Sequence, residues 1–386
     1  MSMTAMEGRD VRAVNWRLPS ALRGLPRILR IALAAHWPMI ALSGLFILGE
    51  MIMTWPLEAP RAAPVTGLAA GLLGLFMVPL FVFIAFVFTP LKLISHARAG
   101  LEGSVLKQLA RDIRKTFLNP ARLLNFAIFL AIMLMFEKAA LDFKANIPAV
   151  HPFSWDERLM RLDRWLHLGS DPWQLLHPLM GHPPVTFAVN LAYNLWFFFL
   201  IGSWLVIATS ARHSHLKMRF MSAFMLTWLA AGGIMALAFS SAGPVYYARL
   251  GLPGDPFEPL MAYLHGVNAR FPIWALQTQD MLWTQYVNAK AGFIGISAFP
   301  SMHNAVAALL ALAAWKVSRP LGAAMTLFAL MILTGSVHLG WHYAVDGYAG
   351  ILIAVVCWRL AGGFADWMER RGETRRYRAL LRRISS

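Results

Sequence analysis

Residues 321–360 read LGAAMTLFALMILTGSVHLGWHYAVDGYAGILIAVVCWRL, two long apolar runs that meet at a short polar stretch. A helix of about 20 apolar residues is long enough to cross the hydrocarbon core of a bilayer. We therefore predict two membrane-spanning helices, over residues 321–341 and 343–360. Because the runs nearly touch, these helices must form a tight hairpin with the polar stretch at one membrane surface.

The composition of the whole chain agrees with this interpretation. Hydrophobic residues make up 58% of the 386 residues and charged residues 14%, against about half and about a quarter in soluble domains. The only cysteine, Cys357, lies inside an apolar run, so no intramolecular disulfide forms. A net charge of +16 is a feature of nucleic-acid-binding proteins. The placement of the charges indicates a membrane instead, and we expect no nucleic acid partner.

Six further apolar runs bring the predicted number of spans to eight. They cover residues 31–55, 67–91, 123–143, 185–208, 220–239 and 298–317. We therefore predict an all-α integral membrane protein with about eight transmembrane helices.

Lys and Arg residues are unevenly divided between the two sides of this arrangement. With a cytoplasmic amino terminus, 26 of the 35 Lys and Arg residues fall on the cytoplasmic side and eight on the other, with Lys138 inside the third span. Cytoplasmic flanks of membrane helices collect positive charge. We therefore expect a protein of the plasma (inner) membrane with both termini in the cytoplasm.

Three segments outside the spans are amphipathic and are predicted to lie along the membrane surface. They cover residues 101–117, 154–169 and 363–386. In the second segment, Ser154 and Glu157 have the spacing of a capping box, which predicts a helix start. The alternative for the basic segments is a solvated helix that does not bind lipid.

The predicted topology brings chemically active side chains from three segments to one membrane surface, the extracytoplasmic one. The sixth span begins there with Ser301 and His303, the seventh ends at His338, and the eighth starts with His342 and Asp346. Ionisable groups at the edge of a span are costly to hold there and usually mark a functional site. A lone histidine more often bonds a neighbouring helix, so the hypothesis depends on the grouping.

The spacing of these residues suits an attack on phosphorus. His342 and Asp346 are four residues apart and share a helix face, so the carboxylate can accept from one imidazole nitrogen and leave the other as nucleophile. His303 can protonate the leaving oxygen and then act as base toward the incoming hydroxyl. Ser301 can donate a hydrogen bond to a phosphoryl oxygen, and the exposed amides at the helix start favour an anion.

These residues resemble motifs of the type 2 phosphatidic acid phosphatase superfamily. Its second motif, Pro-Ser-Gly-His, is matched by residues 300–303 except at Met302. Its third motif, Ser-Arg, five residues, His, three residues, Asp, is matched at its end by His342 and Asp346. The resemblance implies a phosphohistidine on His342, oriented by Asp346, with His303 as the acid and with no metal or other cofactor.

The resemblance covers about residues 123–362 and implies a division of the chain. We expect an N-terminal extension with two spans and an amphipathic segment over 1–122, a six-helix phosphatase-like catalytic core over 123–362, and a basic tail over 363–386.

Two departures from the family pattern concern the cations that hold phosphate. Ser336 stands where the third motif has Arg, and only SSAGPVYY, residues 240–247, occupies the place of the first motif, Lys, six residues, Arg-Pro. The missing Arg, and the Tyr directly after His342, are closer to the branch with inositol phosphorylceramide synthase and sphingomyelin synthase. Enzymes of that branch transfer phosphorylated head groups between lipids. A phosphodiester carries one negative charge where a monoester can carry two, so a site with fewer phosphate-binding cations suits a diester.

The remaining positive charge has four candidate sources in the sequence, Lys290, Arg249, Arg270 and His338. We place Lys290 and His338 with Ser301 as candidate substrate-binding residues, although the sequence does not choose among the four. For each of the three Lys and Arg residues, a solvated loop charge is the alternative.

Two alternatives to this hypothesis stay open. His338, His342 and Asp346, at spacings of four and four, could bind a metal on one helix face. A transporter or receptor could bind a lipid or anion without chemistry. If the protein is an enzyme, its partners are a lipid substrate in the membrane and either water or a second lipid as acceptor. The sequence indicates neither the acceptor nor the oligomeric state.

Overall fold

The computed structural model describes residues 25–55, 71, 73–74, 77–78, 80–82, 84–98, 104–210, 213–288 and 295–385. Within these ranges every regular element is a helix and there is no strand, so the all-α prediction is confirmed. The long helices are α2 (Leu25–Thr54), α6 (Pro120–Val150), α9 (Pro183–Thr209), α15 (Arg319–His338) and α16 (Ala344–Arg371), and α10 (His215–Thr227) begins a 24-residue helical span that continues to Ala238. The short helices are α4 (Thr89–Arg98), α5 (Val105–Phe117), α7 (Asp156–Leu166), α8 (Pro172–Met180), α12 (Glu258–Asn268), α13 (Trp274–Val287), α14 (Met302–Trp315) and α17 (Glu373–Ser385). Helical turns extend some of these elements or stand in loops: η1 (Ile84–Phe88), η2 (Trp228–Met235), α11 (Ala236–Ala238), η3 (Pro244–Tyr246) and η4 (Ala248–Leu250).

Side-chain caps fix where several of the long helices begin. The Asn119 side chain accepts hydrogen bonds from two backbone amides in the first turn of α6, and Pro120 takes the first helical position. Ser214 and Ser318 cap α10 and α15 in the same way. A capping side chain satisfies amides that have no partner inside the helix, and proline at the first position loses no hydrogen bond. These local signals therefore determine the starts of α6, α10 and α15.

Seven helices are long and apolar enough to cross a membrane among the residues described, so the protein is an integral membrane protein. Six of them correspond to predicted spans. Most of the predicted span over residues 67–91 lies outside the described residues, and the candidate there is Leu80–Arg98.

The predicted span over 298–317 is shorter in the structure than the sequence suggested. Its helix, α14, has only 14 residues, because Ala298, Phe299 and Pro300 stay outside the helix and Ser301 caps it. The apolar residues that precede Pro300 extend the hydrophobic run beyond the start of the helix. The third predicted span, over 123–143, is longer in the structure, because α6 continues past residue 143 to Val150.

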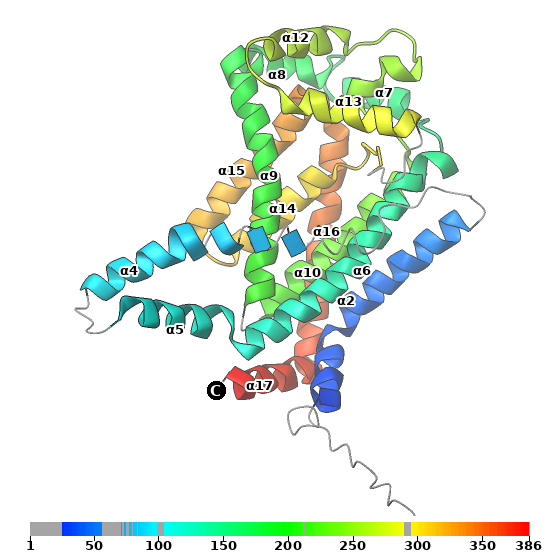
Figure 1. The fold of residues 1–386 in the computed structure, drawn as a ribbon. Coiled ribbons are helices and arrows are strands. Elements are labelled where there is room, and N and C mark those ends of the chain that lie inside the picture. The colour runs from blue at the N-terminus through cyan, green and yellow to red at the C-terminus, as the bar shows by residue number, and fades with distance from the viewer. Residues whose placement is uncertain are drawn as a thin grey trace, which may run out of the picture.

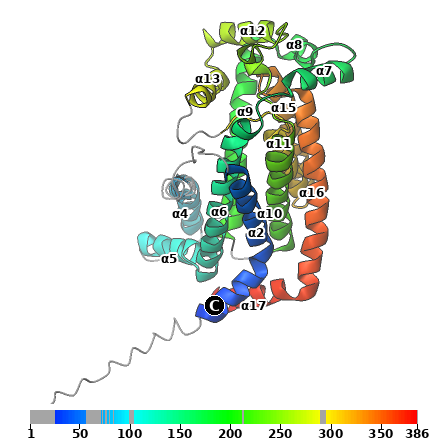
Figure 2. The ribbon, with the colours of Figure 1, turned by 90° about the vertical axis from the view of Figure 1, so that its right-hand side faces the viewer.

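The helices form one bundle with two distinct ends (Figure 1). The short helices α7, α8, α12 and α13 gather at one end, which we call the loop end, and α17 lies across the other, which we call the tail end. Figure 2 shows α2, α6, α10 and α16 running along the bundle between the two ends. The α4 and α5 pair lies to one side, and α5 buries none of its side chains in the described structure.

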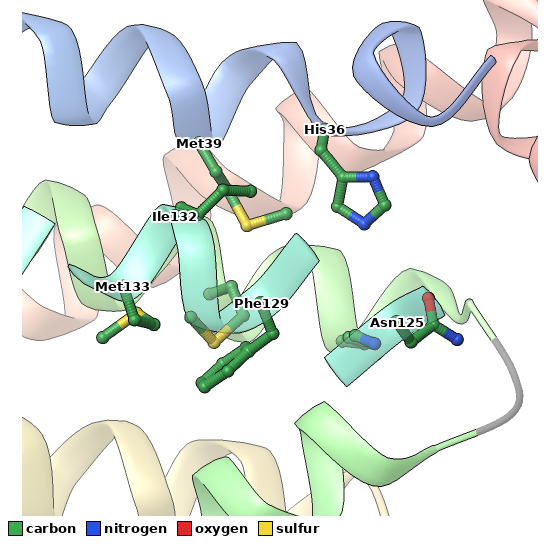
Figure 3. Close-up of a pocket in the computed structure, with 8 residues that line it drawn as sticks. His36, Met39, Asn125, Phe129, Ile132 and Met133 are labelled. Atoms are coloured by element: carbon green, nitrogen blue, oxygen red, sulfur yellow. The ribbon is translucent and has the colours of Figure 1, made fainter. Parts of the chain in front are cut away.

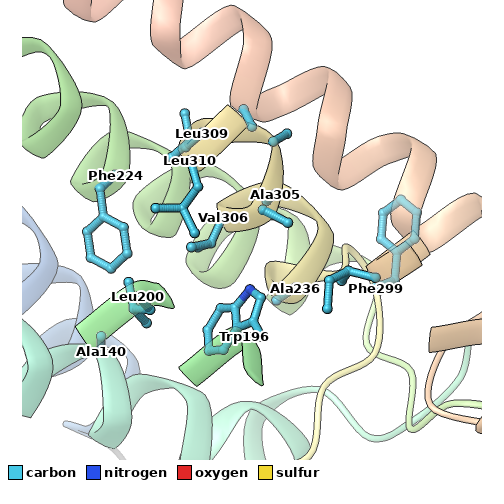
Figure 4. Close-up of a cluster of buried hydrophobic side chains, with 14 of the residues drawn as sticks. Ala140, Trp196, Leu200, Phe224, Ala236, Phe299, Ala305, Val306, Leu309 and Leu310 are labelled. Carbon is cyan, nitrogen blue, oxygen red and sulfur yellow. The ribbon is translucent and has the colours of Figure 1, made fainter. Parts of the chain in front are cut away.

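The short helix α14 is held at the centre of the bundle. It packs against α9, α10, α15 and α16. Figure 4 shows Trp196 and Leu200 of α9, Phe224 of α10 and Leu309 of α14 in one cluster of buried side chains. Because its neighbours surround it, α14 is stabilised by packing and does not need the length of a spanning helix. The first turn of α14 is at the end of this helix that faces the loop end of the bundle, where the predicted site lies.

Candidate functional site

His303 and His342 come from different elements and lie close together. His303 is the second residue of α14, and His342 lies in the short turn between α15 and α16. Their ring centroids are 6.4 Å apart. This separation lets both rings reach one phosphorus atom between them, as the hypothesis requires.

His342 is oriented by the start of α16. Its Nδ1 lies 3.3 Å from Oδ2 of the buried Asp346, and the same oxygen accepts a hydrogen bond from the Tyr343 amide at 3.0 Å. Burial and the nearby charge of Lys144 lower the pKa of His342 to about 3, against a hydrogen bond to the Ala298 backbone that raises it. The imidazole is therefore neutral at pH 7, the state in which a histidine nitrogen is a nucleophile.

An aromatic pocket fixes the ring of His303. The ring stacks on Tyr193 at 5.0 Å between centroids, with 18° between the planes, and lies 4.3 Å from the Trp196 ring. The Trp196 indole also donates to the His303 carbonyl at 3.0 Å. Both aromatic residues belong to α9, so this helix sets the direction in which His303 faces His342.

Ser301, Asn304 and Ser336 form a buried polar network beside the two histidines. Ser301 caps α14, and its amide donates to the Asp346 carbonyl at 2.9 Å. The Asn304 amide group donates to the hydroxyl oxygens of Ser301 and Ser336 at 3.0 and 3.2 Å. Ser336, at the position of the family's Arg, thus braces the hairpin and its carbonyl accepts from the His342 amide. Phosphate binding by Ser301 stays a prediction.

Lys144 is the cation that the sequence analysis missed. It lies in α6, past the end of the predicted span, and its charge acts on both His303 and His342. Its side chain has no hydrogen-bond or ion-pair partner among the residues that the structure describes. The chain before α14 packs directly on it, because a Cβ atom on Gly295 would lie 2.6 Å from the Lys144 carbonyl oxygen. Lys144 is therefore a positive charge near enough to act on both rings, and no residue in the described part of the chain pairs with it.

A sequence signal for Lys144 exists but was missed because it was sought after the fifth span. Lys144 is followed by six residues and then by His151 and Pro152, which is the spacing of the family's first motif with His in place of Arg. His151 itself is bonded to the Leu237 carbonyl at 2.6 Å and to the Ser154 hydroxyl at 3.2 Å. It therefore joins the loop after α6 to the end of the fifth span.

Helix α7 also contributes to the site, which its sequence does not indicate. The predicted capping box is wrong, since the helix begins at Asp156 and Ser154 bonds His151 instead. The buried Asp163 accepts from the first two amides of α16, those of Ala344 and Val345, at 2.7 and 2.8 Å. Asp163 therefore caps, from another helix, the element that carries Asp346.

The other buried carboxyl group of α7 ties the fifth-span loop to the same turn. Asp156 accepts from the amides of Ala242 and Gly243 at 2.9 and 2.8 Å and from the Tyr343 hydroxyl at 3.0 Å. Burial raises the pKa of Asp156, and raises that of Asp163 to about 7, although the backbone hydrogen bonds oppose this. Gly243, at φ +106°, leaves no room for a side chain, because a Cβ atom would lie 2.7 Å from the Trp341 carbonyl oxygen.

The remaining candidates that the structure describes, His338, Arg249 and Arg270, are not brought to the histidine pair. His338 is buried but turned toward α8 and α9, where its Nε2 lies 2.9 Å from the Thr186 hydroxyl and its ring 6.3 Å from that of His177. Arg249 is paired with Asp280, Arg270 is exposed, and Lys290 lies outside the described residues. Since His338 faces away, the proposed metal site of His338, His342 and Asp346 lacks its third ligand.

A family model described as the PAP2 superfamily matches residues 157–360, just over half of the chain. No curated protein and no solved structure matches the chain. The matched range begins in α7 and ends in α16, so it includes His303, His342 and Asp346 but not Lys144.

Proposed function

Because the chain belongs to the PAP2 superfamily, we propose that it transfers or hydrolyses a lipid-linked phosphate ester through a phosphohistidine formed on His342. The observation that carries this proposal is the 6.4 Å approach of the His303 and His342 rings, with Asp346 on Nδ1 of His342. Substrate and acceptor are lipids, or a lipid and water, in the surrounding membrane.

The reaction proceeds in two balanced steps. In the first, Nε2 of His342 forms a bond to phosphorus, the bond from phosphorus to the leaving oxygen breaks, and protonated His303 gives its proton to that oxygen. Burial and the neighbouring His342 and Lys144 lower the pKa of His303, so the negative charge of the bound phosphoryl group must offset them for the ring to hold this proton. Asp346 stabilises the positive charge that develops on His342. In the second, an acceptor hydroxyl or water gives its proton to His303 and bonds to phosphorus, and the bond between Nε2 and phosphorus breaks.

Lys144 is the group in this arrangement suited to hold the negative charge of the phosphoryl oxygens. With Ser336 at the position of the family's Arg, Lys144 is the one Lys or Arg that the described residues bring near the histidine pair. A single positive charge suits a phosphodiester with one charge better than a monoester with two. This supports head-group transfer between lipids, as in the branch of inositol phosphorylceramide and sphingomyelin synthases.

Replacing Lys144 by Met keeps the length and apolar stem of the side chain and removes its charge. We expect kcat/KM to fall about 100- to 1,000-fold, because a charge that stabilises the developing phosphoryl oxygens is lost. Steady-state turnover of a phospholipid donor in detergent measures this. Lys107→Met, at an exposed position on α5, is the control for loss of one positive charge and should keep full turnover. Equal turnover in both variants would show that the charge of Lys144 does not contribute to the reaction.

The proposed activity is tested with the purified chain in lipid nanodiscs containing excess chelator. The donors are a phosphomonoester lipid, such as phosphatidic acid or a polyprenyl phosphate, and a phosphodiester phospholipid, each with and without a hydroxyl-bearing lipid acceptor. Mass spectrometry follows the products. We expect turnover of the diester with transfer to the acceptor. Release of inorganic phosphate from the monoester alone would indicate a hydrolase, and no product or phosphoprotein with any donor would favour a transporter.

The orientation of the protein is also part of the proposal. The excess of Lys and Arg in the segments assigned to the cytoplasm, which include α17, supports a site that opens to the extracytoplasmic side of the plasma (inner) membrane. Residues 123–362 are proposed as the catalytic core because they contain the matched range 157–360 and Lys144, with an N-terminal extension before them and a basic tail after them.

A further inference from the structure

Helix α7 exposes an apolar edge at the loop end of the bundle. We give this name to Leu162, Trp165, Leu166 and Leu168, the exposed apolar residues at the end of α7 and just after it. Trp165 is 74% exposed and Leu168 is 97% exposed. Leu159 and Met160 of the same helix are buried in the core. The helix therefore has apolar residues on two sides, and only one side packs against the residues that the structure describes.

Leu168 is held outward by a strained and well-fixed turn. It is the one non-glycine residue with a positive φ, 57°, in the described part of the chain. Leucine is disfavoured in this left-handed conformation. The turn is closed by Arg164, whose guanidinium donates two hydrogen bonds to the Asp171 carboxylate at 2.8 and 2.9 Å. An apolar side chain fixed away from the protein is costly in water but not in an apolar medium.

The lipid-facing side of α16 leads directly to this edge. Side chains exposed at intervals of four residues mark that side of the candidate span: Tyr348, Leu352, Val356 and Leu360. Nε2 of His167, between the residues of the apolar edge, lies 3.0 Å from the Tyr348 hydroxyl. Figure 2 shows α7 at the loop end, beside the start of α16. The apolar edge therefore continues the side of α16 that contacts lipid.

The length of α16 shows that the hydrocarbon core extends to the level of α7. The first exposed charge along α16 is Arg359, and a charged side chain is costly inside the hydrocarbon core. From Ala344 to Arg359 the helix is about 22 Å long at the usual rise, whereas the core is about 30 Å thick. A tilted helix would cover still less of this thickness. Lipid therefore reaches past the first residue of α16, where α7 lies.

Helix α7 also holds the start of α16 along its whole length. Asp156, Asp163 and His167 contact, in this order, the Tyr343 hydroxyl, the amides of Ala344 and Val345, and the Tyr348 hydroxyl. A displacement of α7 would break these contacts together. A medium that keeps α7 in place therefore stabilises the turn just before α16.

We propose that the apolar edge of α7 is embedded in the membrane leaflet at the loop end, and that this contact stabilises the turn that carries His342. The partner is a lipid surface, at the boundary between head groups and acyl chains. Trp165 suits this boundary, because an indole has an apolar ring and an N–H group that can donate to head groups. Neither the contact nor the stabilisation requires turnover, so the proposal does not depend on the proposed function.

Spin labels in lipid nanodiscs measure the depth of the apolar edge. Cys357, the single cysteine, is replaced in a Cys357→Ala background, and Trp165→Cys or Leu168→Cys then carries the label. We expect both labels to collide more often with oxygen than with a water-soluble nickel chelate, at a depth of about 5–10 Å into the boundary layer. Leu352→Cys, on the lipid-facing side of α16, is the control for lipid, and His265→Cys, exposed on α12, is the control for water.

Two results of this measurement overturn the proposal. Labels at residues 165 and 168 that behave like the label at residue 265 would show that the edge is in water. Immobile labels that neither oxygen nor the nickel chelate reaches would show that a protein surface, such as a second copy of this chain, covers the edge.

Hydrogen–deuterium exchange in nanodiscs tests whether the contact stabilises the turn. Trp165→Ser combined with Leu168→Ser removes most of the apolar edge and leaves the buried side of α7 unchanged. We expect peptides covering residues 339–347 to exchange about threefold faster or more in this double variant, because a less stable segment opens more often. Peptides covering residues 125–133, which line a narrow cavity toward the tail end (Figure 3), should exchange as in the wild type.

His265→Ser is the matched control for exchange, since it changes another exposed side chain at the loop end. It should exchange like the wild type in both regions. Wild-type exchange over residues 339–347 in the double variant overturns the proposal. Equal acceleration over residues 339–347 and 125–133 also overturns it, because the loss of stability would then be global and not specific to the turn.

Discussion

His342→Ala is expected to lower turnover of every lipid donor by at least about 10,000-fold, because removing a nucleophile leaves only the contribution of the surrounding site. The phosphohistidine should vanish with it. In the wild type, a 32P-labelled donor quenched in alkali should leave label on the protein that acid releases, since a phosphoramidate bond is stable in base and labile in acid. The loss should appear in kcat, because the variant still has Lys144 and His303 to bind substrate.

The matched control is His265→Ala. His265 is exposed on α12 at the same end of the bundle, so it tests the loss of an imidazole near the site without touching the histidine pair. Both variants should elute as folded protein in detergent with similar Tm values. Wild-type turnover in His342→Ala would refute the nucleophile assignment. Label that stays on the variant would place the phosphoenzyme on another residue.

The parts of the site that depend on short sequence separations could be predicted. His342 and Asp346 are four residues apart at a helix start, and side chains four residues apart lie on the same face of a helix. His303 could be assigned to the same site because the predicted spans that carry these residues end at the same membrane surface. The all-α fold follows from the same runs, since a lipid-exposed backbone must satisfy its hydrogen bonds within a helix.

The parts that depend on tertiary contacts could not be predicted. Hydropathy ends the third span where Lys144 introduces a charge, whereas in the structure α6 continues to Val150 and Gly295 packs against it. In the sequence, the two buried carboxyl groups of α7, Asp156 and Asp163, look like part of the polar face of a surface helix. The backbone amides that they bind lie 86 and 87 residues further along the chain for Asp156 and 181 and 182 residues further for Asp163, and no local pattern predicts such pairs.

These contacts explain how polar groups can be held at a membrane edge. The start of α16 would leave its first amides without partners inside the helix, and Asp163 and Asp346 satisfy three of them. The turn that carries His342 is therefore fixed at both ends, by the Ser336 carbonyl before it and by α7 after it. This leaves Lys144 and the two imidazoles with polar atoms available to a substrate, which is the preorganisation that the proposed phosphoryl transfer needs.

Asp346→Asn is the second substitution with a large expected effect, and it separates the charge of this residue from its structural role. Asn keeps the shape and can still accept the Tyr343 amide, as asparagine does at many helix starts. It cannot stabilise the positive charge that forms on His342 during attack, and its amide group can turn the imidazole to the wrong tautomer. We expect kcat to fall about 100- to 10,000-fold.

Comparison with Asp346→Ala separates a catalytic role of the Asp346 charge from its role at the helix start. Alanine removes both the charge and the cap, so it should lower the Tm as well as kcat, by an amount equivalent to about 1 kcal/mol for the lost cap. Asparagine should lower kcat while the Tm stays close to that of the wild type. If the two variants lose activity only in proportion to lost stability, Asp346 acts as a cap alone, and the histidine must be oriented by other groups. If Asp346→Asn keeps wild-type kcat and a trapped phosphohistidine, the carboxylate charge has no part in the reaction.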